Sequence, residues 1–250
     1  FSGEDMTESV KFKTSETSVL PNASLDEWSL DGKCWNPWEA EGPSYWDTGN
    51  AGAAMLGESN TYPTDDVCDS TSRKAACLAS RFVGVAGIGK FAAGSVFAGR
   101  FGGIDGMNGI IYLGRPFTLR PTRLEGYYKY NPGKIDYVGP GFENEVGQTD
   151  TLMVYVCLGD WSSPVEIRTN PANRKKLDVE NDPHIIAYGI WISGDRQDAY
   201  AKFTVPFVYR AYNRVPNYLI ICCTGSRNGD DFTGSSTSVM YLDEMSLKWD

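Results

Sequence analysis

Aromatic rings and short polar side chains gather in one loop-like stretch near the start of the chain. The stretch is rich in Pro and Gly, and its chemically useful residues are Trp38, Tyr45, Trp46, Asp47 and Asn50. A flat ring can stack on the apolar face of a sugar, while short oxygen-bearing side chains can bind its hydroxyls. The spacing suits neither a helix face nor a single strand. These residues form a candidate ligand surface, and a small core covering one sheet is the alternative interpretation.

A second candidate is the loop 228–234, with the sequence NGDDFTG. Its Asp230 and Asp231 offer carboxylates, and we expect the loop to close the same site as the aromatic stretch. The alternative is a solvated hairpin tip, because Gly, Asn and Asp favour tight turns.

Acidic residues near both ends of the chain suggest a cation site. Asp26 and Glu27 lie in the segment Asn22–Trp28, and Asp243 precedes Glu244 in the last alternating run. These segments resemble the opening and closing segments of sandwich carbohydrate-binding modules. Calcium takes roughly six to eight oxygen ligands, so Asp243, Glu27 and Asp26 are the predicted ligands of a structural Ca²⁺. Alternatively, backbone N–H groups or an arginine bind these carboxylates without a metal.

The residues for catalysis are harder to choose, and we assign no catalytic residue. Glycosidases generally use two carboxylates ~5–10 Å apart, and Glu125 and Asp160 are the acids in strand-like contexts. Both are more simply explained as partners of Arg120, Arg123 or a nearby lysine. His184 is the single histidine, in a turn context, and no nucleophile elbow of the GxSxG type occurs.

Composition excludes several classes of protein. Apolar residues make up 41% of the chain, which is ample for a core. The net charge of −9 argues against nucleic acid and anionic membranes as partners. The sequence contains no run of 18 or more apolar residues, so it predicts no transmembrane helix. The six cysteines show no CxxC spacing that would indicate zinc; they predict free thiols, with a Cys68–Cys77 bridge as the alternative.

Short runs rich in β-branched and aromatic residues, bounded by Gly, Pro, Asn or Asp, recur along the chain and predict strands. The runs are 76–83, 90–101, 109–117, 123–131, 151–161, 185–192, 201–210, 217–225 and 238–247. A short helix is expected near 170–176, and no convincing amphipathic helix is present. The pattern predicts an all-β domain over 22–250, a jelly-roll β-sandwich. Residues 1–21 are polar and aperiodic, which predicts a linker from an upstream domain.

Several strings together resemble one bacterial family. They are SLDEWSLDGKCWNPW, SYWDTGNAGAAMLG, GKFAAGSVFAGRF, GRPFTLRPTRLEGYYKY and the run from FTVPFVYR to YLDEMSL. In this order they resemble the putative carbohydrate-metabolism domain of surface lipoproteins from polysaccharide-degrading gut bacteria, over about 22–250. The resemblance implies a jelly roll like that of carbohydrate-binding modules. It also implies a secreted or cell-surface location, in the outer membrane or periplasm, with a lipid anchor upstream.

The leading functional hypothesis is recognition of an oligosaccharide or polysaccharide by a monomeric, non-enzymatic module. A glycoside hydrolase is the first alternative, and an adhesion or scaffold module that binds protein is the second. Glycan binding without hydrolysis distinguishes the first hypothesis from both alternatives.

Overall fold

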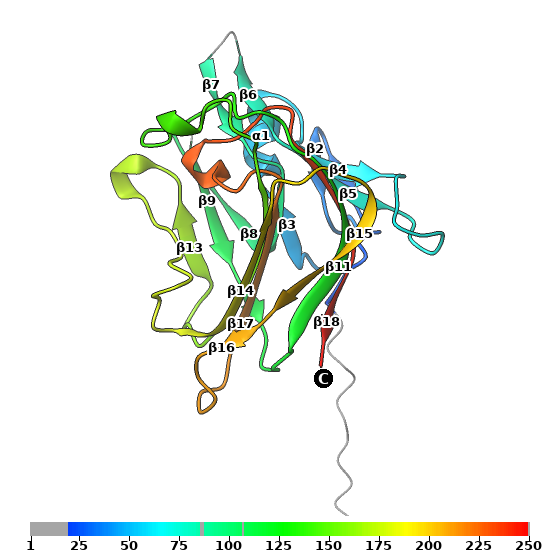
Figure 1. Cartoon of the computed structure of the whole chain (residues 1–250), viewed down its shortest axis with the longest axis vertical. Coiled ribbons are helices and arrows are strands. Elements are labelled where there is room, and N and C mark those ends of the chain that lie inside the picture. Colours follow the sequence, from blue (N-terminus) through cyan, green and yellow to red (C-terminus); the bar gives the residue numbers. More distant parts are fainter. Residues whose placement is uncertain (1–19, 86–87, 107, 250) are drawn as a thin grey trace, which may run out of the picture.

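Two β-sheets built of antiparallel strand pairs face each other and enclose the main core (Figure 1). The computed structural model describes residues 20–85, 88–106 and 108–249. The large sheet has nine strands and the small sheet has five. The predicted fold class, an all-β jelly-roll sandwich, is confirmed.

The large sheet consists of one main path of strands and two short strands that join it. Its path runs β13 (Val165–Arg168), β9 (Asn108–Leu113), β8 (Ser95–Asp105), β17 (Tyr218–Thr224), β12 (Leu152–Gly159), β14 (Ile185–Ser193) and β16 (Val208–Tyr209). Two short strands join this path, since β10 (Arg115–Pro116) pairs with β17 and β3 (Trp46–Thr48) pairs with β8.

The small sheet and the minor elements complete the molecule. The small sheet runs β15 (Gln197–Pro206), β11 (Arg123–Asn131), β18 (Val239–Lys248), β5 (Ala75–Ala79) and β4 (Thr61–Thr64). Separate two-stranded ribbons are β1 (Ser29–Asp31) with β2 (Cys34–Asn36), and β6 (Arg81–Val85) with β7 (Ile88–Ala92). The helices are α1 (Asn50–Leu56) and the 3₁₀ turns η1 (Glu143–Glu145), η2 (Pro171–Asn173) and η3 (Gly229–Asp231).

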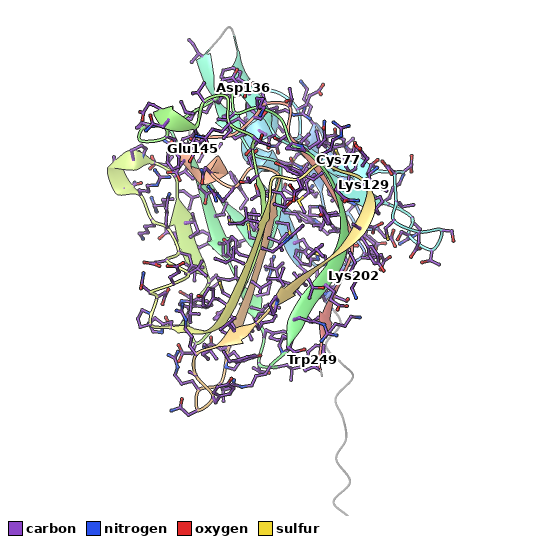
Figure 2. The ribbon with its side chains drawn as sticks, in the orientation of Figure 1. Cys77, Lys129, Asp136, Glu145, Lys202 and Trp249 are labelled. Carbon is purple, nitrogen blue, oxygen red and sulfur yellow. The ribbon has the colours of Figure 1, made fainter. Side chains whose placement is uncertain are left out.

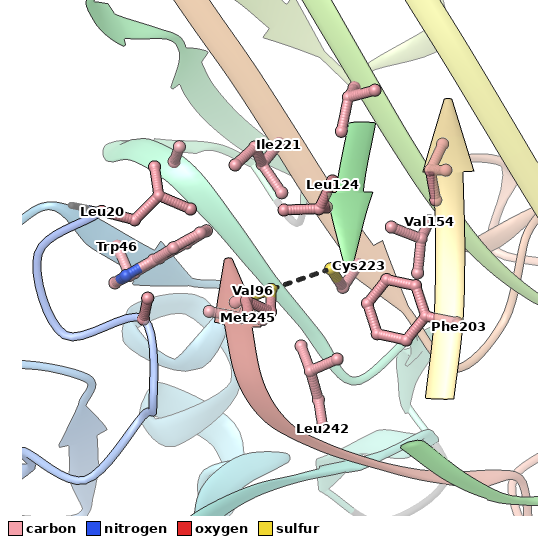
Figure 3. Packing of buried hydrophobic residues seen from close by; sticks show 14 of the residues in the cluster. Leu20, Trp46, Val96, Leu124, Val154, Phe203, Ile221, Cys223, Leu242 and Met245 are labelled. Carbon is pink, nitrogen blue, oxygen red and sulfur yellow. Dashed lines mark hydrogen bonds between the residues drawn. The ribbon is translucent and has the colours of Figure 1, made fainter. Parts of the chain in front are cut away.

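Alternation along the strands builds the core between the sheets. On β15, Phe203 and Val205 are buried, while Lys202 and Thr204 between and beside them are exposed. Successive strand residues point to opposite faces, so the apolar set meets the large sheet. Figure 3 shows this packing, with Phe203 beside Val154 of β12. Each fully buried aliphatic side chain stabilises the fold by roughly 1.5–3 kcal/mol.

The large sheet is covered on its outer face as well. Phe97, Cys157 and Ile220 point away from the main core and form a second cluster with Trp161 and Ile167. Covering both faces explains why β12 (LMVYVCLG) and β17 (YLIICCT) read as nearly continuous apolar runs. The outer cluster also borders a pocket, since Phe97 of the cluster and Tyr155 and Cys222 packed against it lie in the pocket's floor.

The structure divides or extends several predicted elements. The run predicted at 123–131 forms β11 with the same bounds, while the run 76–83 is divided into β5 and β6 at Ser80. Helix α1 was not predicted, and the helix expected near 170–176 is the single turn η2. The six cysteines, all within the described residues, are free thiols, so the alternative of a bridge between Cys68 and Cys77 is wrong.

The predicted linker lies mostly outside the described residues, which begin at Leu20. Leu20 itself is buried, and the carbonyl of Pro21 accepts a hydrogen bond from Trp46 Nε1 at 2.7 Å. The packed domain therefore reaches at least to Leu20. Among the described residues, no helix combines the length and apolarity needed to cross a lipid bilayer.

Candidate functional site

A pocket of about 400 Å³ opens on the outer face of the large sheet, at one end of the sandwich. Strands of the large sheet form its floor. Helix α1, the β6–β7 ribbon and the loop after β17 form its walls, and these elements gather at the same end of the molecule in Figure 1, where the loop is orange.

The floor consists of two rows of side chains that cross the large sheet. The strand register aligns Phe97, Cys222 and Tyr155 in one row, and Ser95, Thr224 and Met153 in the other. Their chain neighbours, such as Val96 and Val154, point into the main core because side chains alternate along a strand. Phe101 and Ile111 continue the floor toward β9. The floor is therefore mainly apolar, with hydroxyl groups at one end.

Small residues let the walls approach closely. On the α1 side, Gly49, Gly52 and Ala53 line the pocket with almost no side chain, next to the larger Met55 and Leu56. Gly229 passes so near the β7–β8 connection that a Cβ there would lie 2.4 Å from Ala93 Cβ. Only glycine allows that approach, so this position holds the loop 228–234 against the pocket.

Lys90 on β7 supplies a cation to the wall. Its Nζ donates to Asn108 Oδ1 at 2.6 Å and lies 3.8 Å from the centre of the Phe232 ring. Phe232 adopts a left-handed backbone conformation with φ of 54°, which is unfavourable for a large side chain and places its ring beside Lys90. Burial lowers the pKa of Lys90. Within the described part of the chain, no carboxylate forms an ion pair with this ammonium group.

Asp230 also lines the pocket, and its carboxylate is opposite in charge to the ammonium group of Lys90. Its side chain is accessible to water, yet it lies inside the hollow among many protein atoms. Because the pocket is open, water reaches the side chain even though many protein atoms surround it. The loss of surrounding water raises the pKa of Asp230, and the positive charge of Lys176 opposes this effect. Its neighbour Asp231 is engaged elsewhere, since it forms ion pairs with Arg174 and Lys176.

Buried hydrogen bonds fix the loop that carries these residues. Asp150 Oδ2 accepts hydrogen bonds from Ser226 Oγ at 2.6 Å, Ser235 N at 2.8 Å and Ser238 Oγ at 2.9 Å. Outside this buried centre, Asn228 Nδ2 donates to Glu145 and Ser236 N donates to Asp136. Figure 2 labels Glu145 and Asp136 at the same end of the molecule as the orange loop. The loop is thus attached to the sandwich on both sides of Asp230.

The chemistry of the pocket suits binding better than acid–base catalysis. Among the described residues, Asp230 is the one carboxylate in the lining, whereas glycosidases generally need two. Tyr155 in the floor is no substitute for a base, because burial raises its pKa well above the ordinary value and keeps the phenol neutral. What remains is an aromatic and aliphatic surface with scattered polar groups, which is the usual form of a small-molecule site.

The structure brings together the two segments that the sequence paired, but through other residues. The aromatic stretch leads into α1, and Gly49 of that stretch lines the pocket. The loop 228–234 lines the opposite wall with Gly229, Asp230 and Phe232. Asp230 is the predicted ligand residue that lines this pocket.

Two predicted ligand residues are enclosed instead. Trp46 is 0% exposed, and its ring packs in the main core. Asn50 is also 0% exposed; its Nδ2 donates to Trp35 O and Thr61 O, while its Oδ1 accepts from Asn60 N. Neither side chain offers surface to a sugar, because each is enclosed and forms its hydrogen bonds within the sandwich. Asn50 in particular attaches the start of α1 to β2 and β4 through these hydrogen bonds.

The other members of the aromatic stretch are half-buried and lie outside the pocket lining. Tyr45 packs against the main core, and the Arg115 guanidinium lies 5.9 Å from its ring centre. Asp47 accepts from Thr48 N and Phe101 N, and burial raises its pKa. Trp38 is half-buried near the β1–β2 ribbon.

Two of the predicted calcium ligands, Asp26 and Asp243, bind the backbone of the segment 65–74, whereas the backbone of the third, Glu27, is hydrogen-bonded to the Asn22 side chain. Asp26 Oδ1 accepts from the backbone N–H groups of Arg73 and Lys74, and Asp243 Oδ2 accepts from Cys68 N. Asp243 Oδ1 is buried and has no partner among the described residues. Those residues contain no group of three acidic, His or Cys side chains placed to hold a metal. The set fits a cation only in part, and calcium stays a prediction.

The acids considered for catalysis form ion pairs away from the pocket. Glu125 pairs with Arg123 and Lys202, which lower its pKa. Asp160 pairs with Arg214 at 3.2 Å and contacts His184 Nδ1 at 3.1 Å. The explanation of Glu125 as a partner of Arg123 is confirmed, whereas the partner of Asp160 is Arg214 rather than Arg120.

Sequence reasoning missed most of the pocket. Lys90, Asn108 and Phe101 lie in or beside glycine-rich runs, whose composition favours tight strand connections and gives no sign of a ligand. Phe97 and Tyr155 were hidden within apolar strands. The sequence signal that could have indicated the pocket was Lys90, a single cation between Gly89 and Phe91 in an otherwise apolar run.

The comparisons with known proteins agree with this architecture. A solved structure described as a putative glycoside hydrolase from Bacteroides thetaiotaomicron is 21% identical with a TM-score of 0.70, over 95% of this chain and 72% of that one. A second putative glycoside hydrolase, from Bacteroides vulgatus, is 18% identical with a TM-score of 0.66, over 90% and 95% of the two chains. At this level of identity the likeness shows the fold. No curated protein sequence matches the chain.

The sequence pattern of one family extends over nearly the whole sandwich. The putative carbohydrate metabolism domain matches residues 26–248, from the segment before β1 to the end of β18. The chain belongs to the putative carbohydrate metabolism domain family.

Proposed function

We propose that this protein binds glycans in the pocket on the outer face of the large sheet, and that it does so without cleaving them. The observation that carries the proposal is a hollow of about 400 Å³ whose lining, among the residues that the structure describes, consists mainly of aromatic and aliphatic side chains with one carboxylate, Asp230. A sugar unit presents an apolar ring face and a circle of hydroxyls. The floor suits the face, and Asp230 and Asn108 suit the hydroxyls.

The family supports the substrate class, since its description concerns carbohydrate metabolism. An extracellular location at the bacterial surface and a monomeric state complete the proposal. The location rests on the resemblance to domains of surface lipoproteins and is tested by fractionation of the producing cell. Light scattering tests the monomeric state.

The test is a binding screen against polysaccharide-derived oligosaccharides, followed by calorimetry on those that bind. Phe232→Ala removes a ring from the wall and should weaken binding about tenfold. Tyr212→Ala is the matched control, because Tyr212 is 81% exposed and does not line the pocket. If no oligosaccharide binds, or if both variants behave alike, the pocket is not a glycan site.

A second candidate function is glycoside hydrolysis, and one observation favours it. The raised pKa of Asp230 is a property that a general acid needs. Release of new reducing ends from a bound oligosaccharide, abolished by Asp230→Asn, would establish the enzyme. Unchanged oligosaccharide after prolonged incubation, with Asp230→Asn altering affinity alone, would establish the binding module.

A further inference from the structure

The pocket carries a charge opposite to that of the whole chain. The protein has a net charge of −9. The described lining residues include two cations, Lys90 and Arg227, and one acid, Asp230, so the lining sums to +1. A cationic hollow in an acidic protein attracts anions locally, because a charge within a low-dielectric wall is screened less than one on the open surface.

Lys90 has N–H donors that remain available to a ligand. An ammonium group has three N–H donors. One donates to Asn108 Oδ1, and the cation faces the Phe232 ring. Among the described residues no further acceptor and no carboxylate contacts Lys90 Nζ, although surface lysines such as Lys74 and Lys175 pair with acids. A half-buried ammonium group with a free donor is stabilised by an anionic partner.

The acid of the pocket does not compensate Lys90. The lowered pKa of Lys90 is caused by burial, with no contribution from Asp230. Burial raises the pKa values of Tyr155 and Cys222 in the floor, and the negative charge of Asp230 adds to that effect. Among the described residues no ion pair joins Lys90 to Asp230, so a ligand can place an anionic group beside Lys90 and hydroxyls beside Asp230.

The geometry points to an acidic glycan as the occupant: a sugar unit whose carboxylate or sulfate ester accepts a hydrogen bond from Lys90 Nζ. The ring of that unit lies against the part of the floor formed by Tyr155 and Phe101, whose side chains are partly exposed. This inference rests on the proposed function and specifies its substrate class. Lys90 is the specificity-determining residue, and Asn108 and Phe232 position its ammonium group.

The experiment compares matched oligosaccharides by calorimetry. Oligogalacturonides supply the carboxylate, sulfated galacto-oligosaccharides supply the sulfate, and neutral galacto-oligosaccharides of the same length are the reference. We expect tighter binding of at least one acidic series. Lys90→Met, which keeps the aliphatic stem, should weaken it about tenfold to a hundredfold while leaving any neutral binding within about twofold.

The controls separate this inference from the proposed function. Lys134→Met makes the same change in net charge at an exposed lysine outside the pocket lining, and it should leave the affinities unchanged. If neutral and acidic series bind equally, or if Lys90→Met and Lys134→Met behave alike, the acidic specificity is wrong although the glycan site stands. If no series binds, the proposed function fails with it.

Discussion

Single residues divide into those that support the sandwich and those that form the pocket, and residue type alone does not tell them apart. Trp46 and Phe232 are both aromatic residues in loop-like sequence. Trp46 is enclosed and donates from Nε1 to Pro21 O, whereas the Phe232 ring faces Lys90 in the pocket wall. Their mutations should therefore affect different properties.

Trp46→Phe should lower the free energy of unfolding by about 1–3 kcal/mol, because it removes a buried hydrogen bond and leaves a small cavity. Glycan affinity should not change, since Trp46 does not line the pocket. Chemical denaturation and calorimetry on the same samples check both parts. A loss of glycan affinity without a loss of stability would mean that Trp46 contacts the ligand after all.

Asp243 provides the residue-scale test of calcium. Its buried Oδ1 has no partner among the described residues, and a cation would supply one. The prediction is that Tm falls when CaCl2 is replaced by excess EDTA, and that Asp243→Asn removes this difference. Superimposable melting curves of the unmodified protein in the two buffers would eliminate the calcium site.

At the scale of elements, the loop between β17 and β18 determines whether the pocket exists. Its anchor is Asp150, which lies just before β12 and receives hydrogen bonds from three residues of the loop, Ser226, Ser235 and Ser238. A carboxylate with several donors is a strong local acceptor, and the donors it satisfies are buried.

Asp150→Ala should cost about 2–4 kcal/mol of stability, since it leaves buried hydroxyl and N–H donors without an acceptor. Because the same loop carries Asp230 and Phe232, glycan binding should weaken as well. Asp136→Ala is the matched control: Asp136 accepts from Ser236 N at 2.8 Å in the same loop but is exposed. Equal losses in the two variants would contradict the buried anchor, and denaturant titration measures them.

At the scale of the whole molecule, the sandwich buries many weak acids that ionise only at high pH. Burial raises the pKa of Cys222 and Tyr209 to about 12, from ordinary values of 9.0 and 10.0. It also raises the pKa of Cys157, Tyr130 and Tyr155. The folded chain therefore holds protons that the unfolded chain releases.

Linkage gives the direction of the pH dependence. For a group whose pKa is raised in the folded state, stability is complete below the unfolded pKa and is lost as pH rises toward the folded pKa. Tm should therefore decline progressively from about pH 9 toward pH 12. Scanning calorimetry across this range checks the slope. A Tm that stays constant up to pH 11 would mean that these thiols and phenols are not buried.

Sequence by itself determined the strands and the class of fold, because strand formation depends on local pattern. The alternation in β15 and the β-branched, aromatic run of β11 indicate strands without knowledge of any partner. Motifs spread along the chain likewise predicted the family, which is confirmed. These properties need only short-range information, and the boundaries of β11 were correct for that reason.

Only the tertiary structure decided which residues form the site. Lys90, Asn108 and Phe232 are separated by 18 residues or more in sequence, and they meet because β7, β9 and the loop after β17 converge on one face of the large sheet. The same packing encloses Trp46 and Asn50, whose types alone suggested a ligand surface. Burial and cross-strand register are properties of the assembled sheets, so the sequence could indicate the two loop segments but not which side chains they turn toward the pocket.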